Sequence, residues 1–374
     1  MITVEPLPAG LPLASRIRVA RDLRGLTQGE VTGRMVNRIT PAALSQIEAG
    51  KVRPTTQTLR DLASALEVPV GYFFAQWPGG LPEDEHPMTF FRDLRATPAR
   101  ERRRALALAL LLNDLVAAIE HHVRLPRLQL PTVAVSTEAQ RDEIEEVAND
   151  LRHRWELGDE PVPHVVREIE RHGIPVARLS MGHRQVDAFS VAFERRPIVL
   201  LTEEKSNYVR SRFDAAHELG HIVMHASHRE PDRNLETQAH TFASSFLLPR
   251  AAALRELPLR LDGEAWSAIA QLKRRWGLSM AAIIRRARDL HRLSEHEYRN
   301  AMKLMSARGW RTNEPGDREL GPPESPLLLE RSLKIIEVEE GLTVEEIVQS
   351  AYLPLTDTLD LVKATHDKRP VIEL

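Results

Sequence analysis

The sequence predicts a mainly α-helical protein with a small β-sheet (α+β). Three observations favour this class. Most segments repeat their apolar residues with helical spacing, only the runs 189–193 and 198–201 resemble strands, and stretches rich in Pro and Gly divide the chain. With 374 residues, of which 42% are hydrophobic and 28% charged, the chain is long enough for two or three globular domains.

Charge and cysteine content exclude several classes of protein. Lys and Arg total 51 against 53 Asp and Glu, so the whole chain has no basic excess for nucleic acid or an anionic membrane. Residues 11–76 nevertheless hold nine basic and five acidic side chains, a net charge of +4, which predicts a local basic surface. Because the chain has no cysteine, we exclude disulfides, thiol nucleophiles and cysteine-bound zinc, and this composition fits a reducing compartment.

The chain start and the apolar runs bear on location. Residues 1–13 lack the basic start of an export signal. The longest apolar run, residues 105–112, is broken by Asn113 and is far shorter than the ~20 residues of a membrane helix. We therefore expect a soluble, cytoplasmic protein with no membrane partner.

The N-terminal segment predicts five short helices. Thr27 and Glu30 form a capping box that begins the second helix. Thr40 caps the third, with Pro41 at its first position. Inward-facing stripes mark the first helix (Ile17, Ala20, Leu23, Leu26) and a later one (Leu59, Leu62, Ala63, Leu66).

The third helix is suited to the major groove of DNA. Leu44 and Ile47 face inward, so small and polar side chains occupy its other faces and can approach base edges. The amides at the start of the second helix are placed for a phosphate, and neighbouring Arg and Lys residues add charge. The candidate DNA-binding residues are Thr27, Gln28, Arg38, Thr40, Ala42, Ala43, Ser45, Gln46 and Lys51.

The same segment contains Arg-Gly-Leu-Thr-Gln at 24–28 and Leu-Ser-Gln-Ile-Glu-Ala-Gly-Lys at 44–51. In this order and spacing it resembles the Xre/Cro-type repressor DNA-binding domain. The resemblance implies a helix-turn-helix that binds a double-stranded DNA operator, and a homodimer that spans two half-sites. The turn at 36–39 is about two residues longer than usual and lacks its Gly. The alternative is a helical bundle used only for protein contacts.

The middle of the chain predicts a connecting helix and a hairpin. Helix 99–123 has apolar residues around too much of its circumference for a lone surface helix, so we expect it to be packed or dimeric. Pro-rich stretches at 78–98 and 125–137 flank it as expected linkers. Further helices are expected at 137–156 and from 206 to 307, and the two strand-like runs form a hairpin.

Residues 214–225 predict a metal site. His217 and His221 are four residues apart on one helix face, so both imidazoles can reach a single tetrahedral ion. Glu218 is offset from them and can take the proton of a water that zinc acidifies to a pKa of roughly 7. The preceding hairpin could offer an edge strand to an extended peptide.

A third ligand is required. A histidine ten residues after the first would fall on Ser227, so Glu236 on the next helix is the better candidate. We interpret His240, one turn beyond it, as a ligand, a hydrogen-bond partner of a ligand or an oxyanion donor. His225 is expected to be a packed residue or a partner of a ligand, and His228 a solvated turn residue.

The stretches 212–221 (RFDAAHELGH), 236–243 (ETQAHTFA) and 247–249 (LLP) together resemble the ImmA/IrrE family of zinc-dependent peptidases. Residues 186–190 and 198–200 fit as well. The resemblance implies a zincin-like domain with Zn²⁺ held by His217, His221 and Glu236 and with Glu218 as the general base; His240 stands where Asn or Asp is usual. Features near 266–279 and 309–316 resemble longer members that carry a repressor-type domain.

The two resemblances imply a DNA-binding transcriptional regulator with a zinc-dependent endopeptidase domain, which cleaves a repressor or itself in response to a signal such as stress. The alternatives are a non-catalytic zincin-like sensor that switches DNA binding on ligand or peptide binding, and a toxin–antitoxin or phage-type module. We expect a DNA-binding domain at 11–76, a linker and connecting helix at 77–136, a peptidase domain at 137–255 and a helical C-terminal extension at 256–374, interpreted as a scaffold.

Overall fold

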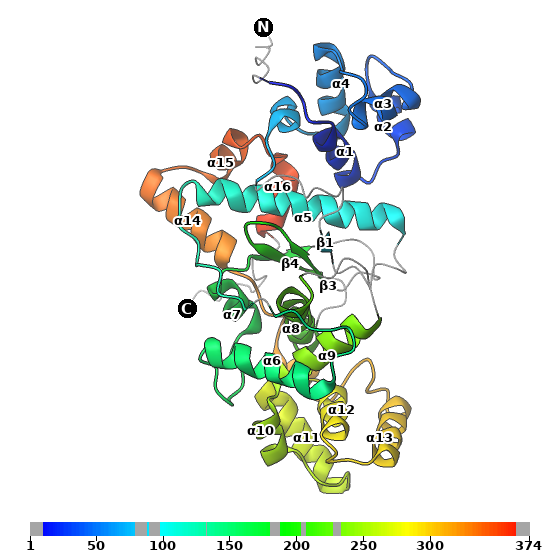
Figure 1. Ribbon diagram of the computed structural model, residues 1–374, viewed down its shortest axis with the longest axis vertical. Coiled ribbons are helices and arrows are strands. Elements are labelled where there is room, and N and C mark those ends of the chain that lie inside the picture. The colour runs from blue at the N-terminus through cyan, green and yellow to red at the C-terminus, as the bar shows by residue number, and fades with distance from the viewer. Residues whose placement is uncertain are drawn as a thin grey trace.

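The structure is a computed structural model that describes residues 10–78, 88–89, 98–131, 133–179, 188–202, 207–226 and 233–363. It confirms a mainly helical protein with a small sheet (Figure 1). The α-helices are α1 (Ala14–Leu23), α2 (Gln28–Arg34), α3 (Pro41–Glu48), α4 (Thr56–Leu66), α5 (Ala99–Glu120), α6 (Arg141–Arg154), α7 (Val165–Arg171), α8 (Tyr208–Met224), α9 (Arg233–Leu247), α10 (Arg250–Glu256), α11 (Gly263–Trp276), α12 (Met280–Asp289), α13 (Glu295–Ala307), α14 (Leu328–Glu340), α15 (Val344–Ser350) and α16 (Leu355–Lys363). Two 3₁₀ helices, η1 (Val70–Phe74) and η3 (Asp317–Leu320), and the strands β1 (Met88–Thr89), β2 (Val176–Leu179), β3 (Ala188–Ala192) and β4 (Pro197–Thr202) complete the described elements.

The sheet has the order β1-β3-β4-β2. Strands β3 and β4 form the expected antiparallel hairpin, with Ala188 opposite Leu201 and Ala192 opposite Pro197. Strand β2 runs parallel to β4 and was not expected, since it has only four residues and Arg178 interrupts its apolar pattern. Strand β1 lies within the stretch interpreted as a linker and pairs with β3 opposite Val191 and Ala192.

Helices cover both faces of the sheet, because alternate strand residues point to opposite sides. Phe189 and Leu200 pack with the apolar residues of α5, whereas Val199 and Leu201 pack with those of α8. In Figure 1, α5 crosses the molecule on one side of the sheet and α8 lies on the other. The expectation that α5 is a packed helix is therefore confirmed. Although α5 has 22 residues, neither it nor any other helix among the described residues is long and apolar enough to span a membrane.

Helices α1–α4 and η1 are the five short helices expected at the N-terminus. Thr27 and Glu30 form the expected capping box, and Thr40 accepts a hydrogen bond from the backbone N–H of Ala43. Helix α1 is shared between two cores. Its Ile17 packs inside the bundle, whereas Leu23 packs on the α5 side. The bundle is thus joined to the rest of the chain through a helix of its own core.

Polar contacts attach the same bundle to α5. The guanidinium of Arg16 on α1 forms a buried ion pair with Asp114 of α5, donating to its Oδ1 at 3.0 Å. It also lies 3.5 Å from the ring centroid of Trp77. Further along, Arg24 binds Asp357 of α16 at 2.5 and 2.7 Å. The residue that follows α1 is therefore bound to α16, the last helix among the described residues.

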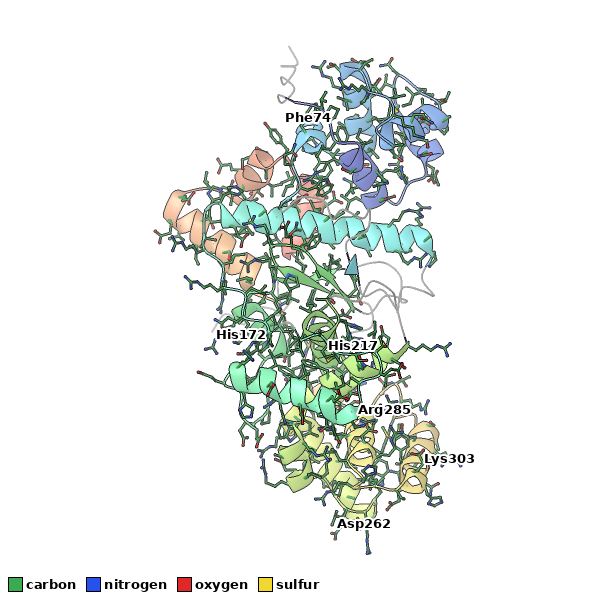
Figure 2. The ribbon with its side chains drawn as sticks, viewed as in Figure 1. Phe74, His172, His217, Asp262, Arg285 and Lys303 are labelled. Carbon is green, nitrogen blue, oxygen red and sulfur yellow. The ribbon has the colours of Figure 1, made fainter. Side chains whose placement is uncertain are left out.

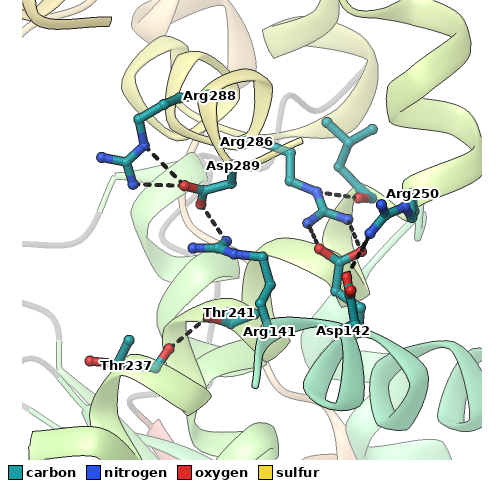
Figure 3. A network of polar contacts seen from close by, with 10 residues as sticks. Arg141, Asp142, Thr237, Thr241, Arg250, Arg286, Arg288 and Asp289 are labelled. Carbon is teal, nitrogen blue, oxygen red and sulfur yellow. Dashed lines mark hydrogen bonds and ion pairs between the residues drawn. The ribbon is translucent and has the colours of Figure 1, made fainter. Parts of the chain in front are cut away.

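Helices α10–α13 form one end of the molecule (Figure 1). The buried Arg286 of α12 donates to both carboxylate oxygens of Glu145 on α6, at 2.5 and 3.2 Å. Beside this pair, Arg141 on α6 lies 2.7 Å from Asp289 (Figure 3). The network fixes α12 against α6, which in turn packs along α9.

The Gly- and Pro-rich segment 309–326, which follows α13, is attached to neighbouring helices at two points. The fully buried Lys273 of α11 pairs with Glu314 at 3.0 Å and with Asp317 of η3. Further on, the buried Glu324 pairs with Arg212 of α8 and accepts the backbone N–H of Val166 at 2.9 Å. This segment therefore connects α10–α13 to α14–α16, which pack on α5.

Candidate functional site

The candidate metal centre depends on a close approach of α8 and α9. Gly220 lies where the helices meet, and a Cβ atom at this position would come within 2.9 Å of Cδ1 of Phe242. Glycine therefore permits the spacing, and the stacked rings of Phe242 and Phe246 fill the space behind it. The side chains of one face of α8 and the first turn of α9 then converge.

Three of these side chains place their donor atoms together. The Nε2 atoms of His217 and His221 are 3.0 Å apart. Glu236 places Oε2 3.3 Å from Nε2 of His217 and Oε1 3.5 Å from Nε2 of His221. The three residues form a group that could hold a metal ion, and they are the three expected from the sequence. Figure 2 locates His217 in the middle of the molecule, between the sheet and helices α10–α13.

The dimensions of this group suit zinc. A tetrahedral ion with bonds of about 2.0–2.1 Å separates neighbouring ligand atoms by about 3.3–3.4 Å. The three observed separations, 3.0, 3.3 and 3.5 Å, lie around that value. The electrostatics agree. Burial disfavours a charged His217, but the carboxylates of Glu236 and Glu218 outweigh this effect and raise the pKa of His217, so the group favours positive charge between its members.

Glu218 occupies a separate position beside the group. Its Oε2 accepts a hydrogen bond of 2.7 Å from the hydroxyl of Ser190 on β3, and both residues are buried. Burial raises the pKa of Glu218 to about 7, although the charge of His217 and the Ser190 hydroxyl oppose the shift. The carboxylate is therefore oriented by the sheet. The sequence pattern did not identify Ser190 as its partner.

His240 lies over the ring of His217, with ring centroids 4.6 Å apart in an edge-to-face arrangement. Its Nδ1 is 3.0 Å from the carbonyl oxygen of Glu236. Burial lowers the pKa of His240 to about 4, and the neighbouring charge of His217 acts in the same direction. His240 is outside the group of three candidate ligands, at its rim, as a neutral ring.

His225 is fully buried and contacts a candidate ligand. Its Nδ1 is 3.0 Å from Nδ1 of His221, and its Nε2 is 3.0 Å from Oε1 of Gln238 on α9. It is therefore packed and bonded to a candidate ligand, the two roles that the sequence left open. His228 and the stretch 180–187, which includes Val186 and Asp187 of the expected pattern, lie outside the described residues.

The hairpin was also expected to offer an edge strand to a peptide. Strand β1 already pairs with β3 opposite Val191 and Ala192, so this part of the edge is covered. An extended peptide therefore cannot pair with β3 at these two residues while β1 is in place.

The candidate DNA interface lies on α2 and α3. Leu44 and Ile47 are buried, whereas Ala42, Ser45 and Gln46 are exposed and Ala43 is half-buried. The side-chain amide of Gln28 donates to Glu48 at 2.8 Å, and Arg21 holds the same carboxylate. The start of α2 is thereby joined to the end of α3, which fixes the angle between the two helices.

The long turn before α3 is anchored rather than loose. The amide of Asn37 donates to Oδ2 of Asp61 on α4 at 2.8 Å, and Gln57 holds the other oxygen. Arg38 and Lys51 are exposed on either side of α3, together with Thr40 and Thr27 at the helix starts. Of the expected DNA-binding residues, only Gln28 and Ala43 are half-buried, and the others are exposed.

Comparison with known proteins identifies a domain family for each of these two parts of the chain. Residues 17–73 match the family model described as Helix-turn-helix, and residues 169–288 match the one described as IrrE N-terminal-like domain. A helix-turn-helix DNA-binding domain is fused to an IrrE-like, peptidase-family domain. The IrrE-like match begins and ends later than the range 137–255 expected for this domain, and it includes α11 and most of α12. No curated protein matches the chain.

Proposed function

We propose that the protein is a transcriptional regulator whose IrrE-like domain is a zinc-dependent endopeptidase. The observation that carries the proposal is the convergence of Nε2 of His217, Nε2 of His221 and the Glu236 carboxylate at separations that suit one tetrahedral ion. When bound, zinc supplies Lewis acidity, which acidifies water and polarises the carbonyl of a peptide bond.

The chain's own residues supply the remaining functions. Glu218 is the general base, which takes a proton from water and delivers it to the leaving amine, and Ser190 holds its carboxylate in place. His240, at the rim, is a neutral ring whose Nδ1–H is bonded to the carbonyl oxygen of Glu236, so its Nε2 is positioned to accept a hydrogen bond from an N–H of the substrate rather than to donate one to an oxyanion. The surrounding burial limits access of bulk water to Glu218, which is only 4% exposed.

The proposed substrate is a repressor protein or the chain itself. If the chain cleaves itself, the two Pro-rich linkers expected from the sequence, 78–98 and 125–137, are the candidate segments, and 78–98 lies mostly outside the described residues. Segment 125–137 is held in place, since Val133 donates its backbone N–H to Val223 at the end of α8 and Gln238 binds the carbonyls of Ser136 and Thr137. Cleavage within 125–137 would require these bonds to break. We therefore favour a separate repressor over cleavage within 125–137.

The experiment that tests the enzyme uses Glu218→Gln. We expect the zinc-loaded variant to retain one zinc per chain and to lose cleavage of itself or of a peptide library by about 10²–10⁴-fold, measured by mass spectrometry. Glu236→Gln is the matched control, because the same change at a ligand should reduce zinc content as well. Cleavage that persists in Glu218→Gln would overturn the assignment of the base.

We further propose that the helix-turn-helix domain binds an operator as a homodimer. Ser45 and Gln46 are exposed on α3 and can contact base edges, whereas Lys51 is placed for a phosphate. After selection of sites from a random duplex library, Gln46→Ala should relax specificity at one position. Lys51→Ala should weaken all sites and reduce the salt slope by about one. An unchanged site preference in Gln46→Ala would count against this docking of α3.

A second function is a switch without cleavage, in which the IrrE-like domain senses a peptide or ligand and alters DNA binding. Arg16 of α1 binds Asp114 of α5, and Arg24 just after α1 binds Asp357 of α16. Helix α5 contacts β4 and α16 contacts β2 of the IrrE-like domain, so these helices connect the two domains. Regulation of DNA binding that survives in Glu218→Gln would favour this function over the enzyme.

A further inference from the structure

A chain of hydrogen bonds leads from the candidate metal centre to the segment before α6. It runs from His221 to His225, from His225 to Gln238, and from Gln238 to the carbonyl oxygens of Ser136 and Thr137. Each of the first two links is 3.0 Å long. His221, His225 and Gln238 are all buried.

The orientation of the Gln238 side-chain amide is fixed by the two carbonyl oxygens that it contacts. Its Nε2 lies 2.8 Å from the carbonyl oxygen of Ser136 and 3.2 Å from that of Thr137, and both of these oxygens can only accept. A flipped amide would place its own oxygen against them. Oε1 must therefore face His225, and it can only accept a hydrogen bond from that ring.

The orientation of the amide determines the tautomers of two histidines in turn. Nε2 of His225 must carry a proton to donate to Gln238. A neutral imidazole has one N–H, and complete burial disfavours a charged ring, so Nδ1 of His225 is an acceptor. Nδ1 of His221, 3.0 Å away, is then the donor. Nε2 of His221 is left with a lone pair directed at His217 and Glu236.

From this geometry we infer that His225 and Gln238 are positioning residues that keep His221 in the one tautomer able to bind a metal through Nε2. The inference rests on the proposed function and deepens it. In metal sites, the partner of a ligand imidazole sets its tautomer and ring orientation, and its loss costs about 10–100-fold in metal affinity. Here the partner is a second imidazole that is itself set by an amide.

The other candidate histidine ligand provides an internal comparison. Among the described residues, Nδ1 of His217 is buried without a hydrogen-bond partner. The chain of bonds therefore acts on His221 and not on His217. In the zinc-free protein we expect His221 to be a single Nδ1–H tautomer.

The first test is the tautomer of His221 in the zinc-free wild-type protein, measured by ¹⁵N NMR of a histidine-labelled sample and assigned with His221→Gln. The inference predicts the Nδ1–H form, and a majority of the Nε2–H form would overturn it. The tautomer is read in the wild-type chain of hydrogen bonds from His221 through His225 to Gln238 (the relay), and the measurement needs no activity. If the NMR confirms the tautomer but the wild type fails to bind zinc, the proposed function fails and the relay stands.

The second test is zinc affinity, measured by competition with a chelator. Gln238→Leu and His225→Leu should bind zinc about 10–100-fold more weakly than the wild type. His225→Gln can accept from His221 and donate to Gln238, so it should recover most of this loss. Thr241→Val is the matched control, since it removes a 2.8 Å hydrogen bond to the carbonyl of Thr237 on the same helix but outside the relay. Equal zinc affinity in Gln238→Leu and Thr241→Val would overturn the inference, and Gln238→Leu decides the matter if His225→Leu does not fold.

Discussion

Gly71 of η1 lies directly against the ring of Tyr352, which follows α15. A Cβ atom on Gly71 would come within 2.2 Å of Cδ1 of that ring. The two residues join the helix-turn-helix domain to the C-terminal helices, as does the pair formed by Arg24 and Asp357. The C-terminal segment, interpreted from the sequence as a scaffold, thus contacts the DNA-binding domain directly.

We predict that Gly71→Ala destabilises the protein by about 1–3 kcal/mol, because the ring or η1 must move to make room. Urea unfolding should show the loss, and Tyr352→Ala should remove most of it in the double variant. Gly33→Ala is the control, since no atom lies within 4 Å of the added Cβ in α2 and the change should be neutral or stabilising. The same loss in both single variants would contradict the contact.

The second prediction concerns the buried ion pair of Arg16 and Asp114. Asp114→Asn leaves the guanidinium buried without its charged partner, so we expect a loss of about 3–5 kcal/mol in the free energy of unfolding. Glu337→Gln removes the partner of Lys334, which forms an exposed pair of 2.8 Å on the surface of α14, and should have little effect. Similar midpoints in urea for the two variants would show that the buried pair does not hold α1 on α5.

The third prediction concerns the spacing of α8 and α9. Gly220→Ala brings its Cβ against Phe242 and should push Glu236 away from the histidines. We expect zinc to bind about tenfold more weakly, which corresponds to 1.4 kcal/mol. Gly220→Ala combined with Phe242→Leu should recover affinity, because the smaller side chain makes room. Unchanged zinc affinity in Gly220→Ala alone would mean that the metal centre tolerates a wider helix spacing.

The fourth prediction is a dependence of stability on pH that arises at His164. Burial, aided by the charges of Arg167 and Arg212, lowers the pKa of His164 to about 4, and its Nδ1 accepts the backbone N–H of Arg167 at 3.2 Å to cap α7. Because the folded-state pKa is below the unfolded value near 6.5, the unfolded chain takes up the proton first. The contribution of His164 is therefore complete above pH 6.5 and is lost as the pH falls toward 4.

His164→Asn keeps a capping side chain without this titration. We expect the urea midpoint of the wild type to fall more between pH 7.5 and pH 5 than that of His164→Asn. Equal falls in the two proteins would assign the acid sensitivity to other groups.

Much of the fold could be predicted because its signals are local. Capping residues such as Thr27 and Thr40 mark helix starts whatever the tertiary structure, and the hairpin has a short turn between two apolar runs. The position of β2 could not be predicted, since its parallel pairing with β4 is non-local and Arg178 breaks its pattern. Arg178 is accommodated because it donates to the backbone carbonyl of Glu324, far along the chain.

In the candidate site, too, the sequence predicted some residues and missed others. The spacing of His217 and His221 depends only on helix geometry, and the sequence also pointed to Glu236 on the next helix. The partners of these residues come from other elements. Ser190 reaches Glu218 from the sheet, and Gln238 is oriented by carbonyls from the segment before α6. Such contacts depend on tertiary packing and leave no periodic signal in the sequence.

The most direct test of the account is a crystal structure of the full chain grown with excess zinc, with anomalous diffraction recorded at the zinc edge. We predict one strong peak within about 2.0–2.2 Å of Nε2 of His217, Nε2 of His221 and a carboxylate oxygen of Glu236. A map without a peak there, or with Glu236 turned away from the two rings, would contradict the metal centre and leave only the DNA-binding function.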